Sequence, residues 1–220
     1  MFFMQKGYLI SFEGGEGAGK TVQSKKLAYK LIEMGYEVVL VREPGSVPIS
    51  EQIRNVVLTT KNIGLVPTIE VLLFQAARAQ LYDELVLPSL KAGKIVIMDR
   101  TRDSSVVYQG VVRGFGTKII EQLNNVSTQT TYPDLTILLD VPENLGLERR
   151  AQTEEVNRLD MENKEFHKKV RLTYLALAKK NDHGRWYIVD ASQPLDEVTE
   201  NIWNILNTTI LQARSVLSVN

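Results

Sequence analysis

Residues 14–21 read GGEGAGKT, and this stretch constrains the fold more than any other feature of the chain. It matches the G-x-x-x-x-G-K-T pattern of a phosphate-binding loop, in which glycines permit a tight turn and backbone N–H groups face phosphate oxygens. Lys20 is then placed to reach the β- and γ-phosphates, and the Thr21 hydroxyl is placed to hold Mg²⁺. Such a loop joins a strand to a helix, and both are predicted here, by the apolar run at 8–13 and by the helical spacing of apolar residues over 22–34. The motif therefore indicates an α/β fold that binds a nucleotide through its phosphates.

Composition narrows the class of protein further. Lys plus Arg number 26 and Asp plus Glu number 26, so the chain lacks the basic excess of a general nucleic-acid or membrane-surface binder. It contains no cysteine, which excludes disulfides, thiolate catalysis and zinc–sulfur sites. No apolar run approaches the roughly 18 residues that a membrane span needs, and no signal peptide is evident. We expect a soluble, cytoplasmic protein without nucleic-acid or membrane partners.

The remaining pattern alternates strands with helices and contains no repeat or linker, so we expect a single domain over 1–220. Further strands are predicted at 37–42, 94–99, 135–140 and 186–190. Helices are predicted at 49–58, 68–90, 104–112, 118–126 and 162–180, after Pro142, and at the end of the chain, where Val198, Ile202, Ile205 and Leu206 share a face. The strands are nearly continuous apolar runs, as in strands covered on both faces. These features predict a five-stranded parallel sheet flanked by helices on both faces.

Ligands of such sheets bind beyond the carboxyl ends of the strands, so residues at these ends are candidates for the site. A carboxylate there is the usual second anchor of Mg²⁺ in phosphate-loop enzymes. We prefer Asp99 to Asp140, because Arg100 beside Asp99 could bind a second phosphate, whereas Asp140 could merely shape the turn before the next helix. Arg42 ends another strand, and guanidinium groups match phosphate oxygens two at a time, so Arg42 and Arg100 are expected to flank that second phosphate.

The apolar pattern disappears over residues 151–160, and this polar segment, taken as about 149–160, resembles a lid. Its arginines, Arg149, Arg150 and Arg158, could close over the transferring group, although for Arg150 a solvated surface charge is an equally good interpretation.

Phe74 and Arg78 are one helical turn apart and could bind a base, but their spacing alone favours a core ring and a surface cation. His167 and His183 are expected at the surface.

A set of motifs in order resembles the thymidylate kinase family over roughly residues 8–190. Besides the loop, the set comprises REPG at 42–45, LLF to RAQ at 72–80, DR at 99–100, DSS at 103–105, YQG at 108–110 and PDLT at 133–136. Gly17 stands where some members carry an arginine, which resembles the bacterial type whose lid supplies that arginine. The resemblance implies a phosphate-loop nucleoside monophosphate kinase that transfers the γ-phosphoryl group of ATP to dTMP in dTTP synthesis, with Mg²⁺, as a homodimer.

The resemblance also implies roles for residues. Thymine would stack on Phe74, bond to Arg78 through a carbonyl, and lie with its edge against Ser105 and Gln109. The ATP phosphates would lie on the whole loop, which comprises Gly14, Gly15, Glu16, Gly17, Ala18, Gly19, Lys20 and Thr21.

Around the sugar, Tyr108 would crowd C2′ and Glu16 would meet the 3′-hydroxyl. Arg42 and Arg100 would hold the acceptor phosphate, and Thr21 and Asp99 would hold Mg²⁺. The implied catalytic cations are Lys20, Arg100, Arg149 and Arg158, with Arg149 alternatively against adenine.

Four residues depart from the family pattern: Val22, Ser46, Thr101, which replaces an aromatic residue, and Arg102, an unusual charge. Two other classes of protein remain as alternatives. One is a nucleotide switch or binding module that holds GTP or ATP without phosphorylating a metabolite. GTPases of this class normally show D-x-x-G and N-K-x-D, but residues 163–166 read NKEF. A kinase for another small acceptor would share the loop and differ in the acceptor pocket.

Overall fold

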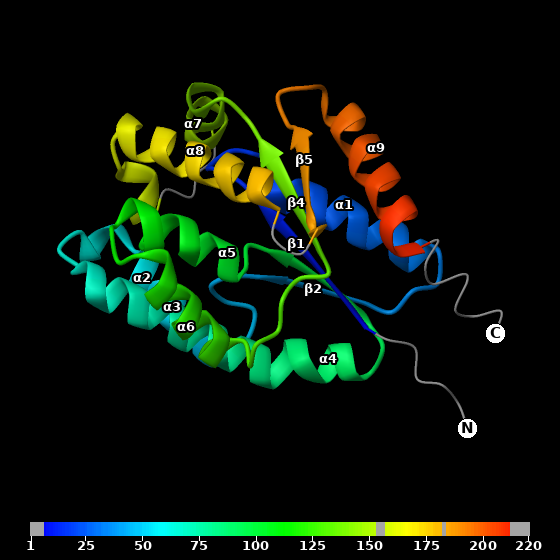
Figure 1. Cartoon of the computed structure of the whole chain (residues 1–220), viewed down its shortest axis with the longest axis horizontal. Helices are drawn as coiled ribbons and strands as arrows, with labels where there is room; N and C mark the ends of the chain where they lie inside the picture. Colours follow the sequence, from blue (N-terminus) through cyan, green and yellow to red (C-terminus); the bar gives the residue numbers. More distant parts are fainter. Residues whose placement is uncertain (1–6, 153–156, 182–183, 212–220) are drawn as a thin grey trace.

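The computed structural model of the chain describes residues 7–152, 157–181 and 184–211. Its centre is a five-stranded, all-parallel sheet in the order β2-β3-β1-β4-β5, which confirms the predicted fold (Figure 1). The strands are β1 (Tyr8–Glu13), β2 (Val38–Arg42), β3 (Ile95–Asp99), β4 (Leu135–Asp140) and β5 (Trp186–Asp190). Asp99 is level with both Phe12 and Arg42 in the strand register. The carboxyl ends of β1, β2 and β3 therefore meet at one edge of the sheet.

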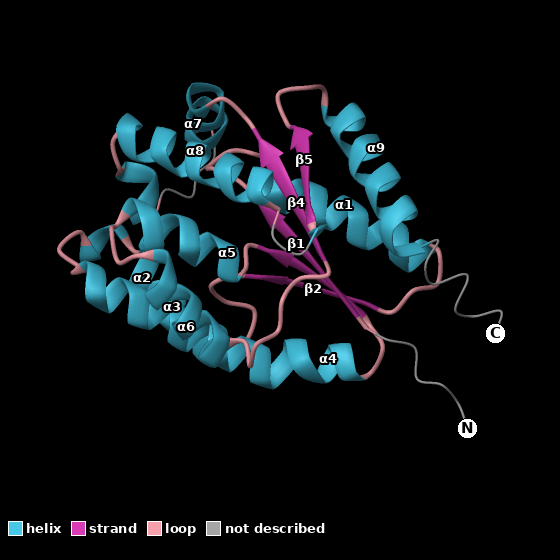
Figure 2. Cartoon of the chain, in the orientation of Figure 1, coloured by secondary structure: helices cyan, strands magenta, loops and turns pink. Residues whose placement is uncertain are grey.

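Helices cover both faces of this sheet (Figure 2). The helices are α1 (Lys20–Glu33), α2 (Pro48–Leu58), α3 (Pro67–Leu81), α4 (Leu87–Lys91), α5 (Arg102–Ser105), α6 (Thr117–Ser127), α7 (Glu143–Ala151), α8 (Lys164–Lys180) and α9 (Leu195–Leu206). Leu27 of α1 and Ile202 of α9 pack on one face with Ile10, whereas Val86 packs on the other face with Leu9. The alternation of β1 side chains thus separates two hydrophobic cores.

Two of the strands differ from the expectation that every strand is buried on both faces. The central strands β1, β3 and β4 are almost entirely buried, but Leu40 on β2 and Ile188 on β5 are exposed. Both strands lie at edges of the sheet. An apolar run alone does not distinguish an edge strand from a central one.

The long helix predicted at 68–90 is interrupted by a π-helical turn at Tyr82–Val86, between α3 and α4. Pro88 has no N–H to donate to the preceding turn, and the Leu87 N–H bonds to the Tyr82 carbonyl. A second π-helical turn, Val106–Val112, follows α5 and holds Tyr108 and Gln109. Such turns are frequent at functional sites, because they reorient side chains within a helix.

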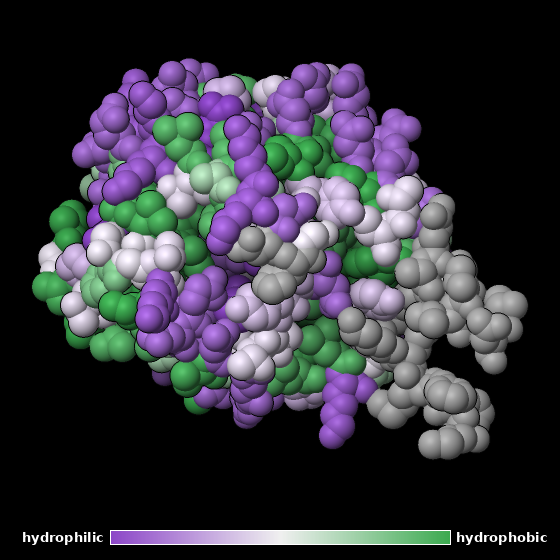
Figure 3. Space-filling view, in the orientation of Figure 1, coloured by the Kyte–Doolittle hydropathy of each residue, from purple (hydrophilic) through white to green (hydrophobic). Residues whose placement is uncertain are grey.

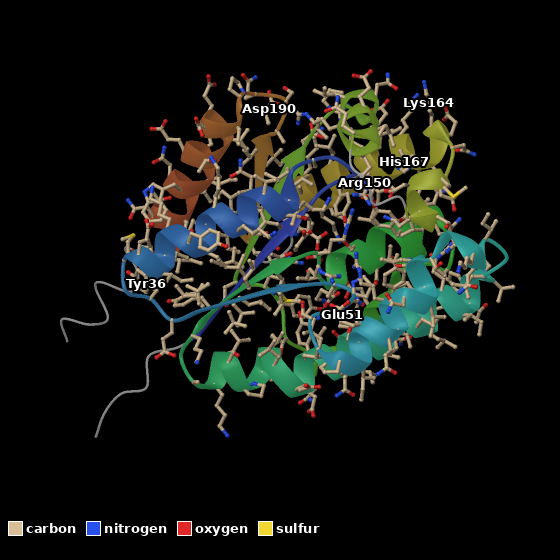
Figure 4. All side chains as sticks on the ribbon, turned by 180° about the vertical axis from the view of Figure 1, so that it is seen from behind. Tyr36, Glu51, Arg150, Lys164, His167 and Asp190 are labelled. Carbon is tan, nitrogen blue, oxygen red and sulfur yellow. The ribbon has the colours of Figure 1, made fainter. Side chains whose placement is uncertain are left out.

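The prediction that His167 lies at the surface is wrong. Its side chain is buried on α8, on the same face as Phe166, Val170 and Tyr174. Figure 4 labels His167 on the ribbon of α8. His183 and residues 153–156 of the predicted lid lie outside the described residues; the rest of that segment forms the end of α7 and a short 3-10 turn at Arg158–Met161.

Candidate active site

A cavity of about 950 Å³ opens at the carboxyl edge of the sheet. Its volume is at the upper end of the range for ligand pockets, roughly 300–1,000 Å³. Most of the predicted site residues line it: Glu16, Gly17, Ala18, Gly19, Lys20, Thr21, Arg42, Phe74, Arg78, Asp99, Arg100, Ser105, Tyr108, Gln109 and Arg149. The fold thus brings together residues that are up to 133 positions apart in the sequence, from Glu16 to Arg149.

The loop between β1 and α1 turns its charged end into this cavity. Gly17 and Gly19 have positive φ, and a Cβ on Gly17 would lie 1.8 Å from the Gly146 carbonyl oxygen, so no side chain fits there. The Lys20 Nζ donates to the carbonyls of Gly14 and Gly15, at 3.1 and 2.6 Å. Burial, reinforced by the neighbouring Arg100, lowers the pKa of Lys20 to about 8. An anion placed here would stabilise the charged ammonium group.

The two strand-end carboxylates have different partners. The Thr21 hydroxyl donates to Asp99, so these two oxygens already lie together at the start of α1. Asp140 is bound instead by Arg171, at 2.7 and 3.0 Å. Among the described residues no group of three His, Cys, Asp or Glu side chains could hold a metal. The Thr21–Asp99 pair fits Mg²⁺, which usually takes one or two protein ligands and completes its shell with phosphate oxygens and water.

Arg100 is fixed in the cavity by an acidic partner and by its own backbone. Its φ of 71° is in the left-handed region that disfavours non-glycine residues, a strain typical of functional sites. Its guanidinium donates to Glu16 at 2.8 Å, and the Tyr108 hydroxyl donates to the same Glu16 oxygen at 2.9 Å. Burial alone would raise the pKa of Glu16, but Arg100 and Lys20 outweigh it and lower the pKa to about 2. Glu16 is thus a permanent anion between two cations.

A buried network behind Arg100 was missed by the sequence analysis. Glu13 is fully buried at the end of β1 and accepts hydrogen bonds from Ser104 at 2.7 Å and Tyr174 at 2.8 Å. Arg100 donates to both of these hydroxyls at 3.3 Å. A charged residue inside an apolar strand was the available signal for Glu13, whereas nothing in the sequence marked Tyr174 on α8.

The same carboxylate explains one departure from the family pattern. The Thr101 backbone N–H and hydroxyl donate to Glu13 at 2.8 and 3.0 Å, and Thr101 is fully buried. Thr101 is absent from the residues that line the described cavity. Its side chain therefore serves the buried network and does not shape the acceptor pocket directly.

At the opposite end of the cavity, Arg78 is a buried group and not the surface cation that its spacing favoured. It is 2% exposed and pairs with Glu43 at 2.6 Å. Its other N–H groups donate to Ser105 at 3.0 Å, to Asn124 at 2.8 Å and to the Thr101 carbonyl at 3.1 Å. Arg78 and Ser105 both line the cavity. Phe74, one turn earlier on α3, is half-buried and lines the cavity.

Three further arginines line the cavity and have different partners: Arg42, Arg149 and Arg150. Arg42 lines it while paired with Glu51 at 3.0 Å, and Arg149 lines it while donating to the Ala191 carbonyl at 2.8 Å. Arg150, for which the sequence left two interpretations open, lines it and pairs with Asp160 at 2.9 Å.

Arg158 is not among the residues that line the described cavity. It is 6% exposed and bound to Glu70 at 2.6 Å. Its catalytic role stays a prediction, one that requires the pair with Glu70 to open.

Comparisons with known proteins identify the family of the chain. The family model described as thymidylate kinase matches residues 12–202. A thymidylate kinase from Geobacillus sp. (strain WCH70) is 46% identical over 195 residues, which is 88% of this chain and 92% of that protein. The crystal structure of a thymidylate kinase from Ehrlichia chaffeensis superposes with a TM-score of 0.75 and 34% identity, over 91% of this chain and 99% of that one. The chain belongs to the thymidylate kinase family.

Proposed function

We propose that the cavity binds ATP and dTMP end to end, with their phosphates meeting between Lys20 and Arg100. As a member of its family, the chain is an ATP-dependent nucleoside monophosphate kinase that phosphorylates dTMP to dTDP. The observation that carries the proposed arrangement is the convergence of Lys20, Arg42 and Arg100 on one cavity that Phe74 and Gln109 also line. Such a cavity offers cations to two phosphate chains and an aromatic face to a base.

The proposed reaction needs no general base from the protein. A phosphate monoester has a second pKa near 6, so dTMP is largely a dianion at neutral pH and attacks the γ-phosphorus directly. Catalysis then consists of holding two mutually repelling anions in line and neutralising the charge that spreads over the transferring group. Lys20 would hold the donor phosphates, and Arg42 and Arg100 the acceptor phosphate. Glu16 would accept from the sugar 3′-hydroxyl and keep Arg100 in place.

Thr21 and Asp99 would hold Mg²⁺, which when bound neutralises charge on the ATP phosphates. Lys20 and the N–H groups of residues 14–21 would bind and orient the same phosphates. Arg149 would lie against adenine or reach the transferring group, and Arg158 would do so only after leaving Glu70. The segment 149–160 would act as the lid that excludes water.

We also propose a homodimer. The neighbouring helices α2, α3 and α6 carry exposed apolar side chains: Ile49, Val56, Ile69, Leu72, Ile119 and Val126. Figure 3 shows apolar side chains gathered at the edge of the molecule where α2 and α3 lie. Burying such a face against a second copy is favourable by roughly 25 cal/mol per Å² of apolar area. Leu72→Asp should convert the dimer to a monomer in light scattering, and a monomeric wild type would contradict the proposal.

No described helix is both long enough and apolar enough to traverse a lipid bilayer. We propose that the protein works in the cytoplasm, where its product dTDP would supply dTTP synthesis.

The experiment that tests the acceptor site is ADP release with ATP and Mg²⁺ in the presence of dTMP, dUMP, dCMP, AMP, shikimate or no acceptor. We expect dTMP to give the highest kcat/KM. Equal ADP formation without an acceptor would support an ATPase or nucleotide switch, and a preference for another acceptor would support a different small-molecule kinase. A change in the Trp fluorescence of a Phe74→Trp variant on addition of dTMP would locate the base independently of turnover.

A further inference from the structure

Glu70 is a buried carboxylate to which the motifs assign no role and the proposed mechanism assigns none beyond binding Arg158. It projects from α3, is 1% exposed, and is not among the residues that line the described cavity. Gln109 donates its side-chain Nε2 to Glu70 Oε1 at 2.9 Å. Arg158 donates to Oε2 at 2.6 Å and Arg113 to the same oxygen at 3.3 Å. Glu70 therefore connects two arginines to Gln109, which lines the cavity at the end where the proposed function places the base.

The two arginines determine the charge of this carboxylate. Burial alone would raise the pKa of Glu70, but the Gln109 hydrogen bond, Arg158 and Arg113 outweigh it and lower the pKa below its ordinary value. An ionised carboxylate has acceptors and no donor. Whatever group faces it must donate, so the Gln109 amide must present its NH₂ group to Glu70.

An amide that presents its NH₂ group to one side presents its carbonyl oxygen to the other. Gln109 lies in the π-helical turn Val106–Val112 and lines the cavity. Within residues 7–152, 157–181 and 184–211, no hydrogen bond to Gln109 Oε1 is made. Oε1 is thus an acceptor without a donor at the place where the proposed function puts the edge of the base.

We propose that Glu70 is a specificity-determining positioning residue: it fixes the Gln109 amide with its carbonyl oxygen toward the base and so selects pyrimidines that carry N3–H. This inference rests on the proposed function, because it needs the base beside Gln109. Thymine and uracil have a hydrogen on N3 that donates to a carbonyl oxygen, whereas cytosine has a lone pair on N3. Cytosine would therefore place two acceptors against each other in a buried pocket.

Without Glu70 the discrimination would be weak, because an amide can turn over and offer NH₂ to cytosine as readily as it offers oxygen to thymine. Turning it in the presence of Glu70 would place the amide oxygen against a buried negative charge. A parallel arrangement occurs at Ser105. Arg78 donates to its hydroxyl oxygen at 3.0 Å, which leaves the Ser105 proton free to point elsewhere. At both residues a buried charged side chain determines which hydrogen-bonding group of a neutral side chain stays available to a ligand.

The test is Glu70→Gln, which keeps the size of the side chain. A glutamine can either accept from the Gln109 NH₂ group or donate to the Gln109 oxygen, so it no longer fixes the amide. Steady-state kcat/KM is measured for dTMP, dUMP and dCMP. We expect the dCMP-to-dTMP ratio to rise about tenfold, mostly through KM, since one buried mismatched hydrogen bond is relieved. The dUMP-to-dTMP ratio should not change, because both bases carry N3–H. Glu70→Asp, which keeps the charge, should stay closer to wild type than Glu70→Gln.

Two controls separate positioning from general damage. Arg113→Gln removes another partner of Glu70 and leaves the Gln109 contact, so the dCMP-to-dTMP ratio should stay at its wild-type value. Gln109→Met removes the amide, and in that background Glu70→Gln should have no further effect on the ratio. Thermal unfolding monitors folding. If Glu70→Gln does not fold, Glu70→Gln with Arg113→Gln takes its place, because it removes one of the two cations together with the carboxylate.

A folded Glu70→Gln variant with an unchanged dCMP-to-dTMP ratio would overturn the inference. So would a Glu70→Gln substitution that raises this ratio as much in the Gln109→Met background as in the wild type. The proposed base site fails in a different way. If Gln109→Met leaves kcat/KM for dTMP unchanged in an active enzyme, the base does not lie beside Gln109 at all.

Discussion

The two ends of the cavity are built on different principles. At the phosphate end, Lys20 and Thr21 follow directly from a loop of eight residues, and Asp99 and Arg100 come from the end of a neighbouring strand. At the base end, two polar side chains of the cavity are bound by a buried charged partner on another element: Arg78 donates to Ser105, and Glu70 accepts from Gln109. The loop at the phosphate end therefore depends on backbone geometry, with Arg100 held by Glu16, whereas Ser105 and Gln109 at the base end depend on the buried charges of Arg78 and Glu70.

This difference predicts that changes at the phosphate end mainly reduce turnover. Lys20→Ala should lower kcat by about a thousandfold or more, because a cation that neutralises the transferring group is lost. Circular dichroism and thermal unfolding should resemble wild type. The exposed Lys25→Ala on the same helix is the matched control and should retain full activity. An unchanged kcat in Lys20→Ala would reject the assigned role and break the comparison.

Changes at the base end should instead reduce stability. Arg78→Met would leave Glu43, which is 6% exposed, as an unpaired buried carboxylate and should cost about 3–5 kcal/mol in the free energy of unfolding. Adding Glu43→Gln to Arg78→Met should recover part of this loss, because the stranded charge is gone. Denaturant titration measures both variants. If the single variant were as stable as wild type but inactive, the buried-charge account of this end would be wrong.

A smaller effect is expected for Phe74, the ring on which thymine is proposed to stack. Phe74→Ala should raise KM for dTMP by about tenfold, since stacking on an aromatic side chain contributes about 1–3 kcal/mol per base. KM for ATP should change little, because Phe74 lies on α3 and not on the phosphate loop. Equal changes in the two KM values would indicate that the two ends are not independent.

The smallest effect concerns pH at the phosphate end. The pKa of Lys20 in the free protein is about 8, so its charge is lost as pH rises through that value. We expect kcat/KM for ATP to fall roughly fourfold between pH 7 and pH 8.5, whereas kcat at saturating ATP stays level, because bound phosphates restore the ammonium charge. A folded-state pKa below the ordinary 10.5 also means that stability of the free protein rises between pH 8 and pH 10.5. A flat kcat/KM profile up to pH 10 would contradict the assignment.

Much of the fold and part of the site could be predicted because they depend on local patterns. The strands, the loop and the strand-end residues follow from apolar runs and from glycines that permit positive φ, and the described cavity contains the predicted residues except Gly14, Gly15 and Arg158. Two predictions went wrong on helices: spacing favoured a surface position for Arg78, and His167 was expected in solvent, but both are buried.

Arg100 and Arg102 show the limit of local inference most clearly. They stand two positions apart after β3, yet Arg100 lines the cavity, whereas Arg102 is fully buried, bonds Asn125 at 2.8 Å and lies 3.5 Å above the ring of Tyr132. In the sequence, Arg102 was only an unusual charge. In the structure it joins α5 to α6 and the segment that leads into β4.

The amino-acid sequence alone predicts the parallel sheet, the phosphate loop and the edge of the sheet at which the cavity opens. These features need only neighbouring residues, because apolar periodicity and glycine conformations act within one element. Only the folded structure shows which arginines line the cavity, which are bound to carboxylates such as Glu70 and Glu43, and which way the Gln109 amide points. The reason is physical: a buried charge is stable only beside its partner, and that partner is brought close by folding and not by position along the chain.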